Sequence, residues 1–214
     1  SLPNIYPIDK NVSKTETCTI FFRYKNDNML AGEMQRISLT SDKIIEVALI
    51  ERLLEGPDPK NIELQRIFNN KVVLKDVSVD NDIITLMFNN EILNVASDYP
   101  GNRNDPAWIV KANQAQLLGI YSIVNTITEY GRFSKVQILV DVEGNGQYVK
   151  VMRKDFGFTE NEDSPAGLLS RDASLILSPD RAAHMFFKYI SNSDYLSAYE
   201  YVLDIENNTK KPPR

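Results

Sequence analysis

The segment LLGIYSIVNTITEYGRFSKVQILVD, residues 117–141, predicts an amphipathic helix that leads directly into a β-strand. Its apolar side chains recur at intervals of three and four residues, which places them on one face of a helix. Gly131 is the expected end of that helix, and the following KVQILVD is rich in β-forming residues. A domain that combines helices and strands is therefore expected. The residues on the shared helix face are Leu117, Ile120, Val124 and Ile127.

Three polar residues, Asn125, Thr126 and Thr128, interrupt the apolar helix near its middle. Either they line a binding or catalytic site, or they belong to the architecture. Asn125 and Thr126 are adjacent, so they point about 100° apart around the helix and do not converge. Thr128 can donate its hydroxyl to the carbonyl four residues earlier. We therefore predict a polar seam that fixes the helix to a neighbouring loop.

The remaining elements together predict an α+β fold. We expect one small mixed or antiparallel sheet of three to five strands, with two helices packed on one face and a helical segment at the C-terminus. A first helix should begin after Ser41 and end at the Gly56-Pro57 pair. The long helix should begin at Asp105 and Pro106. The other expected elements are strands at 17–24 and 32–40, a hairpin at 70–89, a strand at 147–152 and two helices within 178–204.

Composition restricts the classes of function that the chain can have. The 214 residues carry a formal net charge of -5, which argues against nucleic acid or anionic lipid as the main partner. A zinc site needs three or four ligands, and the sequence has one histidine and one cysteine. Cys18 lies in an alternating strand pattern, so we interpret it as a buried apolar residue. His184 lies on a C-terminal helix without a catalytic motif around it. No cofactor is expected.

Two weaker patterns leave alternatives open. DVEGNG, residues 141–146, resembles the start of a calcium loop but lacks the later glutamate, so a tight turn is the preferred interpretation. Glu91 and Asp98 flank the loop 94–107 and could serve a carboxylate-dependent hydrolase if a cleft joined them to a third carboxylate. A module that binds small ligands or peptidoglycan would need an aromatic-lined pocket, for which Tyr99 and Trp108 are the candidates.

Several segments together resemble the GerMN domain family, the sporulation and spore germination domain of exported bacterial proteins. LIERLLEGP, residues 49–57, is similar to the first helix of that family, and 71–92 to its hairpin. Residues 117–141 resemble its signature, a helix with the pattern V-N-T-L-T-E before a strand ending in V-D-G, and LLSRDASLI, residues 168–176, its tail. Val142 departs from the pattern, because the family typically has glycine there.

The resemblance implies a domain organisation and a location. It covers about residues 17–177, so we assign 15–177 to a GerMN-like domain similar to ring-building modules. Residues 1–14 are expected to be a linker behind a leader and a lipid anchor, outside this chain. Residues 178–214 are expected to form a helical segment. This segment weakly resembles the opening of an NTF2-like domain, and the resemblance implies a second domain that is incomplete in this chain. The implied location is extracytoplasmic and membrane-anchored, in a Gram-positive-type bacterium.

We therefore expect a non-enzymatic envelope protein that acts by protein–protein association, without catalytic, cofactor or metal residues. Its partners would be envelope or sporulation proteins, or a second copy of itself. The hairpin 17–40 is the expected binding edge, because an uncovered strand offers unpaired backbone groups. Arg23, Lys25 and Arg36 on the hairpin, and Lys43 and Arg52 on the next helix, are the charged residues expected at this surface.

Overall fold

The computed structural model describes residues 14–25, 28–39 and 43–200. The chain divides into two compact units between Leu175 and Ile176. The expected linker therefore falls almost wholly outside the described residues, although Lys14 already belongs to the first strand. None of the helices within the described ranges has the length and apolarity needed to cross a bilayer.

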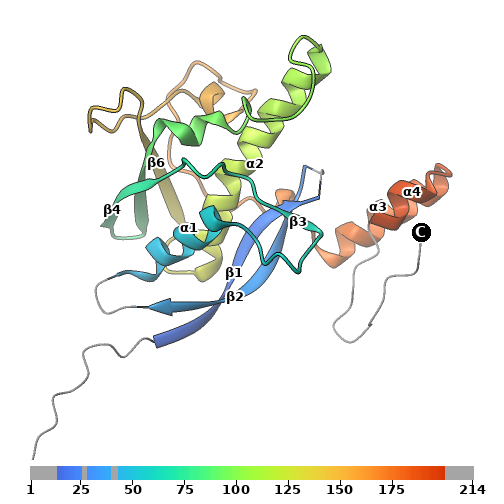
Figure 1. The fold of residues 1–214 in the computed structure, drawn as a ribbon, viewed down its shortest axis with the longest axis horizontal. Helices are drawn as coiled ribbons and strands as arrows, with labels where there is room; N and C mark the ends of the chain where they lie inside the picture. The colour runs from blue at the N-terminus through green and yellow to red at the C-terminus, as the bar shows by residue number, and fades with distance from the viewer. Residues whose placement is uncertain (1–13, 26–27, 40–42, 201–214) are drawn as a thin grey trace, which may run out of the picture. The chain divides into compact units, whose positions relative to one another are not determined.

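The first sheet of the main unit is antiparallel and has the order β2-β1-β3 (Figure 1). It consists of β1 (Lys14–Tyr24), β2 (Leu30–Leu39) and the two-residue β3 (Leu64–Gln65). β1 and β2 pair without interruption from Lys14↔Leu39 to Arg23↔Leu30. Side chains alternate between the two faces of a strand. One face of β1 is accordingly buried, through Cys18, Ile20, Phe22 and Tyr24, while Thr15 and Thr17 on the other face are exposed.

The second sheet is mixed and has the order β4-β5-β6. β4 (Leu74–Asp80) and β5 (Ile83–Asn89) form the expected hairpin, and β6 (Lys135–Asp141) pairs in parallel with β5. The crossover between these parallel strands contains the short helix η1 (Asn90–Asn94) and the long helix α2 (Pro106–Tyr130). The inner face is fully buried and carries Ile84, Leu86 and Phe88 of β5 and Val136, Ile138 and Val140 of β6.

Two helices contact both sheets of the main unit (Figure 1). α1 (Ile45–Glu55) touches β1, β2 and β4, and α2 touches β1 and β6. α2 begins as predicted, with the Asp105 side chain accepting from the Ala107 amide at 2.9 Å and with Pro106 as its first residue. It ends at Gly131, whose φ of 87° favours glycine. Because both sheets contact this helix, most of its residues from Leu118 to Ile127 are buried.

Three details differ from the expectations. The α+β class is confirmed, but the strands form two three-stranded sheets instead of one, because β6 pairs with β5 and neither strand joins the β1–β2 hairpin. Residues 147–152 form no regular strand and join β6 through the single bridge Val140↔Val149. α1 begins at Ile45 after Ile44, which provides no side-chain cap, whereas the expected cap Ser41 lies outside the described residues.

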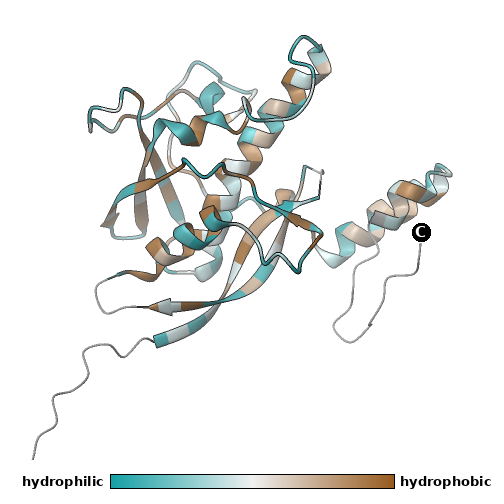
Figure 2. Cartoon of the chain, viewed as in Figure 1, coloured by the Kyte–Doolittle hydropathy of each residue, from teal (hydrophilic) through white to brown (hydrophobic). Residues whose placement is uncertain are grey.

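Between β6 and the end of the main unit lie the short helices η2 (Arg153–Phe156) and η3 (Ala173–Leu175). The C-terminal unit contains α3 (Pro179–Ser191) and α4 (Tyr195–Glu200). Ser178 caps α3 by accepting from the Arg181 amide at 3.2 Å, as predicted. Figure 2 shows apolar and polar residues intermixed along α3 and α4, and several of the large apolar side chains there, including Phe187 and Leu196, are exposed. Residues 201–214 lie outside the described ranges, so the NTF2-like resemblance stays a prediction.

Candidate functional site

The three polar residues of α2 form structural hydrogen bonds within the main unit. The Asn125 side chain donates to the Asp172 carbonyl at 3.0 Å and accepts from the Asp172 amide at 2.9 Å. Thr126 Oγ1 accepts from the Phe21 amide of β1 at 3.0 Å. Thr128 donates to the Val124 carbonyl, four residues earlier, at 2.8 Å. The predicted polar seam is therefore confirmed, and Asn125 bridges the helix to the segment before η3.

The next residue of the same segment reinforces this junction. Glu129 forms an ion pair with Arg171, the neighbour of Asp172. The Arg171 guanidinium also lies 5.6 Å from the centre of the Phe21 ring, a cation–π arrangement. Residues 125–129 thus join α2 both to β1 and to the loop that precedes η3. This explains why such a polar run can occupy a buried helix.

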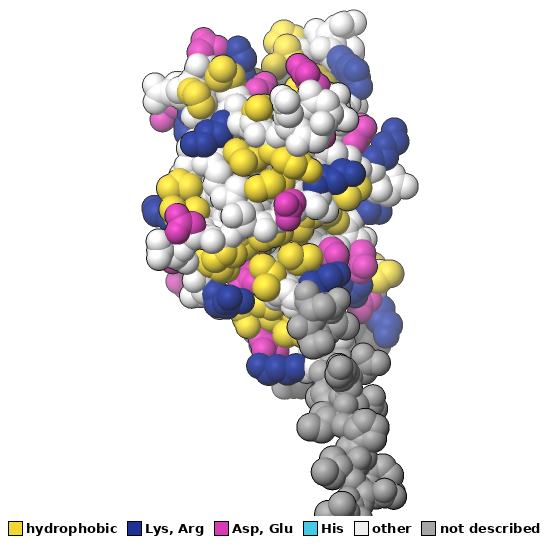
Figure 3. Space-filling model, turned by 90° about the vertical axis from the view of Figure 1, so that its left-hand side faces the viewer, with side chains coloured by type: hydrophobic (Ala, Val, Ile, Leu, Met, Phe, Trp, Pro, Cys, Tyr) yellow, Lys and Arg dark blue, Asp and Glu magenta, His cyan; other side chains and the backbone are white. Residues whose placement is uncertain are grey.

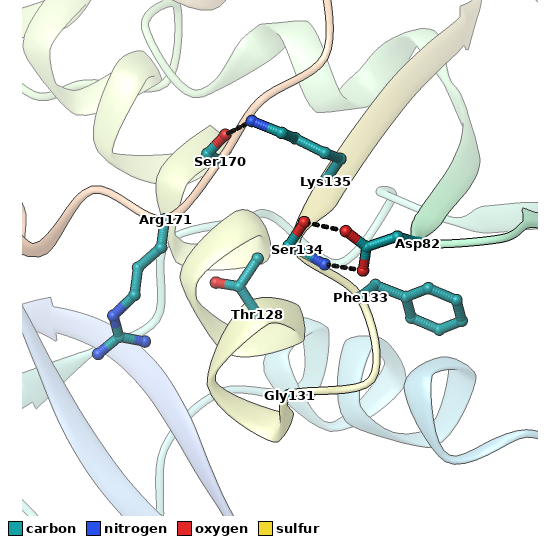
Figure 4. A pocket seen from close by; sticks show the side chains of 8 residues that line it. All are labelled: Asp82, Thr128, Gly131, Phe133, Ser134, Lys135, Ser170 and Arg171. Atoms are coloured by element: carbon teal, nitrogen blue, oxygen red, sulfur yellow. Dashed lines mark hydrogen bonds between the residues drawn. The ribbon is translucent and has the colours of Figure 1, made fainter.

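An open hollow of about 400 Å³ lies beside the end of α2 (Figure 4). Asp82 accepts hydrogen bonds from the Ser134 amide, at 2.9 Å, and from the Ser134 hydroxyl. Lys135 donates to Ser170 at 2.6 Å, and Arg171 points away from Asp82. The hollow is lined by Asp82, Thr128, Gly131, Phe133, Ser134, Lys135, Ser170 and Arg171.

The polar groups of this hollow bond to one another in two pairs, Asp82 with Ser134 and Lys135 with Ser170. The hydrogen bonds from Ser134, helped by the charge of Lys135, lower the pKa of the Asp82 carboxyl. With a lowered pKa, Asp82 is a weaker base than an ordinary carboxylate. Its bonds instead join the β4–β5 turn to the start of β6, where the Lys135 amide also donates to the Asp82 carbonyl at 3.3 Å.

The structure brings Glu91 and Asp98 together, which the sequence could not show. Asn69 Nδ2 donates to Asp98 Oδ2 at 2.7 Å and lies 3.5 Å from Glu91 Oε2, which also accepts from Asn94 at 3.0 Å. Asp98 is exposed, and neither residue lines the hollow beside α2. Among the described residues, no three His, Cys, Asp or Glu side chains are placed to hold a metal ion. Asn69 thus bridges the two carboxylates, and neither belongs to a group of three potential metal ligands within the described ranges.

Tyr99 and Trp108 also meet, but their rings are used within the chain. The Trp108 indole donates to the Tyr99 carbonyl at 3.2 Å. The Arg23 guanidinium lies 5.3 Å from the Tyr99 ring centre, and that of Arg103 lies 5.9 Å from the Trp108 ring centre. One face of each ring is thus covered by an arginine, which leaves less aromatic surface for a ligand.

The remaining sequence candidates have structural explanations. The Asp141 carboxylate accepts from the amides of Asn145 and Gly146 at 3.0 and 2.9 Å, so it holds its own turn and the tight-turn interpretation is confirmed. Cys18 is buried, as predicted, and burial raises the pKa of its thiol, which lowers the fraction of the reactive thiolate. His184 is exposed on α3.

The outer edge of β2 is the remaining candidate. The Phe21 amide points to Thr126, away from β2, and Arg23 pairs with Gln65 of β3. In an antiparallel ladder, a residue opposite a partner whose N–H and C=O point outward also points its own N–H and C=O outward. The β2 residues opposite Phe21, Arg23 and the alternate β1 positions before them therefore direct these groups away from β1. The β2 residues concerned are Gly32, Met34, Arg36 and Ser38. No described hydrogen bond uses their outward N–H and C=O groups, and all four residues are exposed.

The other sheet edges are protected in ways that β2 is not. β4 carries an irregularity between Leu74 and Asp76 and several exposed charged residues. β6 is covered by bridges to Leu169 and Val149. The free side of β1 is occupied by β3 at Arg23 and Tyr24 and by Thr126 at Phe21. Bulges, charges and covering segments are the usual protection of edge strands. Among the described residues, β2 is therefore a long edge with little of this protection.

The charged residues predicted near this edge behave differently from one another. Arg36 is exposed on β2, in the row that points outward. Lys43 pairs with Glu51 at 2.6 Å, and Arg52 donates to Gln35 at 2.8 Å. Arg23 lies over Tyr99, as described above. Arg36 is therefore the charged side chain that accompanies the unpaired backbone groups of β2.

A second exposed surface lies on the β4 side of the main unit. Figure 3 shows apolar side chains spread over this face, with positive and negative side chains between them. The outward row of the second sheet contributes the partly exposed Ile83, Met87 and Leu139. The mixture of charges gives this face no basic patch of the kind that binds nucleic acid.

A family model and several solved structures are similar to this chain. The Germane family, described as sporulation and spore germination, matches residues 19–145. The tandem GerMN domains of the sporulation protein GerM from Bacillus subtilis are 18% identical, with a TM-score of 0.48 over 83% of this chain and 51% of that one. This chain thus spans about half the length of that structure. No curated protein matches the chain.

Two further solved structures resemble the chain. A Clostridium perfringens protein provisionally named a lipoprotein is 20% identical, with a TM-score of 0.37 over 75% of this chain and 93% of that one. The first GerMN domain of GerM from Bacillus subtilis is 16% identical, with a TM-score of 0.39 over 73% of this chain and 98% of that one.

Proposed function

Because this chain belongs to the sporulation and spore germination family, we propose that it is a non-enzymatic envelope protein that works by protein–protein association outside the cytoplasm. The observation that carries the proposal is the open outer edge of β2. A regular, unprotected strand edge is a template on which another strand can add. In contrast, the carboxylates, serines and aromatic rings considered above are engaged in bonds and contacts within the chain.

The proposed binding mode uses backbone hydrogen bonds for affinity and side chains for selection. Gly32, Met34, Arg36 and Ser38 supply the outward N–H and C=O groups. Met34 is 71% exposed and adds apolar area, while Arg36 adds one positive charge. An extended segment of an envelope or sporulation protein would pair with this row as an additional strand of the first sheet.

A proline at Arg36 tests this binding mode. Proline lacks the N–H group, and at Arg36 that group points outward, so the β1–β2 ladder keeps its bonds. Ile20 is unsuitable for the same test, because its N–H points toward β2 and its side chain is fully buried. Arg36→Ala is the matched control, since it removes the charge but keeps the N–H.

We expect the wild type and Arg36→Ala to capture the same envelope proteins from sporulating cells, identified by mass spectrometry. Arg36→Pro should lose them while its circular dichroism stays unchanged. If Arg36→Pro captures these proteins as well as Arg36→Ala does, the β2 edge is not the binding surface.

We also propose that a lipid anchor holds the protein at the outer surface of the membrane, with residues 1–14 as a tether. The support is the family membership and the behaviour expected for exported GerMN proteins. The gene sequence upstream of Ser1 tests this directly. We expect a leader with a cysteine suited to lipid modification, and a start codon immediately before Ser1 would contradict the proposal.

A further inference from the structure

We propose that the β2 edge pairs with β2 of a second copy of this chain, antiparallel and centred on Gln35. This inference rests on the proposed association function and names its partner. The two first sheets would join into one continuous sheet with the order β3-β1-β2-β2-β1-β3. Such an interface presents the same surface from both copies, as two-fold symmetric dimers require.

The direction of the outward groups selects the possible registers. An antiparallel hydrogen-bonded pair needs outward groups on both residues. Centring on Gln35 places Met34 opposite the second copy's Arg36, and Gly32 opposite its Ser38. All four positions have outward groups, and each pair can exchange two hydrogen bonds. Gln35 would lie opposite Gln35 of the second copy. These two residues would form no hydrogen bonds with each other, because the N–H and C=O of Gln35 point toward β1.

Charge favours the register centred on Gln35 over the adjacent register centred on Arg36. That neighbouring register would place the two Arg36 guanidinium groups directly opposite each other, and like charges opposite one another are destabilising. In the register centred on Gln35, each Arg36 lies beside an uncharged Met34. The aliphatic part of the arginine can then cover the methionine, which is 71% exposed in the single chain.

The regularity of β2 also favours pairing of this strand with itself. Its register with β1 is continuous over ten residue pairs, and the strand contains no proline. The β2 side chains on the face opposite Met34 and Arg36 form hydrogen bonds with other parts of the chain. Arg52 donates to Gln35 Oε1 at 2.8 Å, and Glu33 accepts from the Asp58 amide at 3.1 Å. A strand held in this way loses little further freedom when a second strand is added.

Disulfide trapping tests both the partner and the register. Two single-cysteine additions, Met34→Cys and Arg36→Cys, are prepared separately and then mixed under mild oxidation. In the proposed register these cysteines lie opposite each other with Cα atoms about 5.5 Å apart, within the range of a disulfide. Two Met34→Cys chains would instead place their cysteines on a diagonal of about 7–8 Å. The mixture should therefore cross-link faster than either variant alone.

A cysteine on β1 and a measurement of the oligomeric state serve as controls for the trapping experiment. Thr17→Cys lies opposite Arg36 but on β1, so it should not cross-link with any of the variants. Sedimentation of the purified chain should show a dimer whose dissociation constant rises by roughly tenfold or more with Arg36→Pro. Faster cross-linking of Met34→Cys alone would overturn the register. A monomer at all concentrations would overturn the self-association, while capture of an envelope protein that Arg36→Pro abolishes would leave the proposed function intact.

Discussion

Asn125 of α2 and Asp172 of the loop before η3 are joined by two reciprocal hydrogen bonds, 2.9 and 3.0 Å long. The amide of Asn125 satisfies both backbone groups of Asp172, although the two residues are 47 positions apart. A side-chain amide is well suited to this task, because it presents a donor and an acceptor side by side. These two bonds fix the loop before η3 to α2.

Asn125→Ala should therefore destabilise the main unit by about 1–3 kcal/mol, since it leaves both backbone groups of Asp172 without their partner. Urea denaturation followed by circular dichroism measures this loss. Asn104→Ala, at an exposed loop position, is the control and should change the free energy of unfolding by less than about 0.5 kcal/mol. Equal effects of the two substitutions would show that the reciprocal bonds contribute nothing specific.

Thr126→Val should destabilise β1 at Phe21. The substitution keeps the shape of the side chain but removes the oxygen that accepts from the buried Phe21 amide. An unsatisfied buried donor costs about 1–3 kcal/mol, so amide hydrogen exchange at Phe21 should become faster. Thr128→Val removes only a bond within α2 and serves as the control. Unchanged exchange at Phe21 would contradict the role of Thr126.

Val124→Ala should cost about 1–3 kcal/mol, from lost transfer free energy and a residual cavity. Val124 is fully buried, as are Ile120 and Ile127 on the same predicted face. Val110→Ala on the same helix is the matched control, because Val110 is 56% exposed and alanine favours helix. The unfolding midpoint in urea should fall for Val124→Ala and stay level or rise for Val110→Ala.

Tyr130 should stabilise the folded main unit, and this contribution should be lost at alkaline pH. Its hydroxyl donates to Glu16 at 2.8 Å, and this bond raises the pKa of Tyr130 from 10.0 to about 12. Because the folded-state pKa lies above the unfolded one, the contribution is complete below pH 10 and is lost as the pH rises through about 12.

Unfolding midpoints measured across this pH window test the effect of Tyr130. The gap between wild type and Tyr130→Phe should narrow as the phenol ionises. Tyr121→Phe is the comparison for general effects of alkali, because burial, not a carboxylate bond, is the main reason that the pKa of Tyr121 is raised. A gap that stays constant to the alkaline limit would contradict the role of the Glu16 bond.

Local features of this chain could be predicted from sequence because they depend on neighbouring residues. The cap at Asp105, the stop at Gly131, the β4–β5 hairpin and the return bond of Thr128 all involve residues within a few positions. The structural role of the VNTITE segment was also predicted, since adjacent helical residues cannot converge on one ligand. The order of the predicted helices and strands also gave the α+β class, which the structure confirms.

Long-range pairing was decided only by the tertiary structure. Period-two patterning identifies a strand but not the strand beside it, so the division into two sheets could not be foreseen. The meeting of Glu91 and Asp98 at Asn69 also depends on how separate loops pack. The hairpin edge was predicted, but only the tertiary structure shows that the described β2 edge is open, while β3 and Thr126 occupy β1 at Phe21, Arg23 and Tyr24. The reason is physical: periodicity and capping act over a few residues, whereas an edge is defined by what the rest of the chain leaves uncovered.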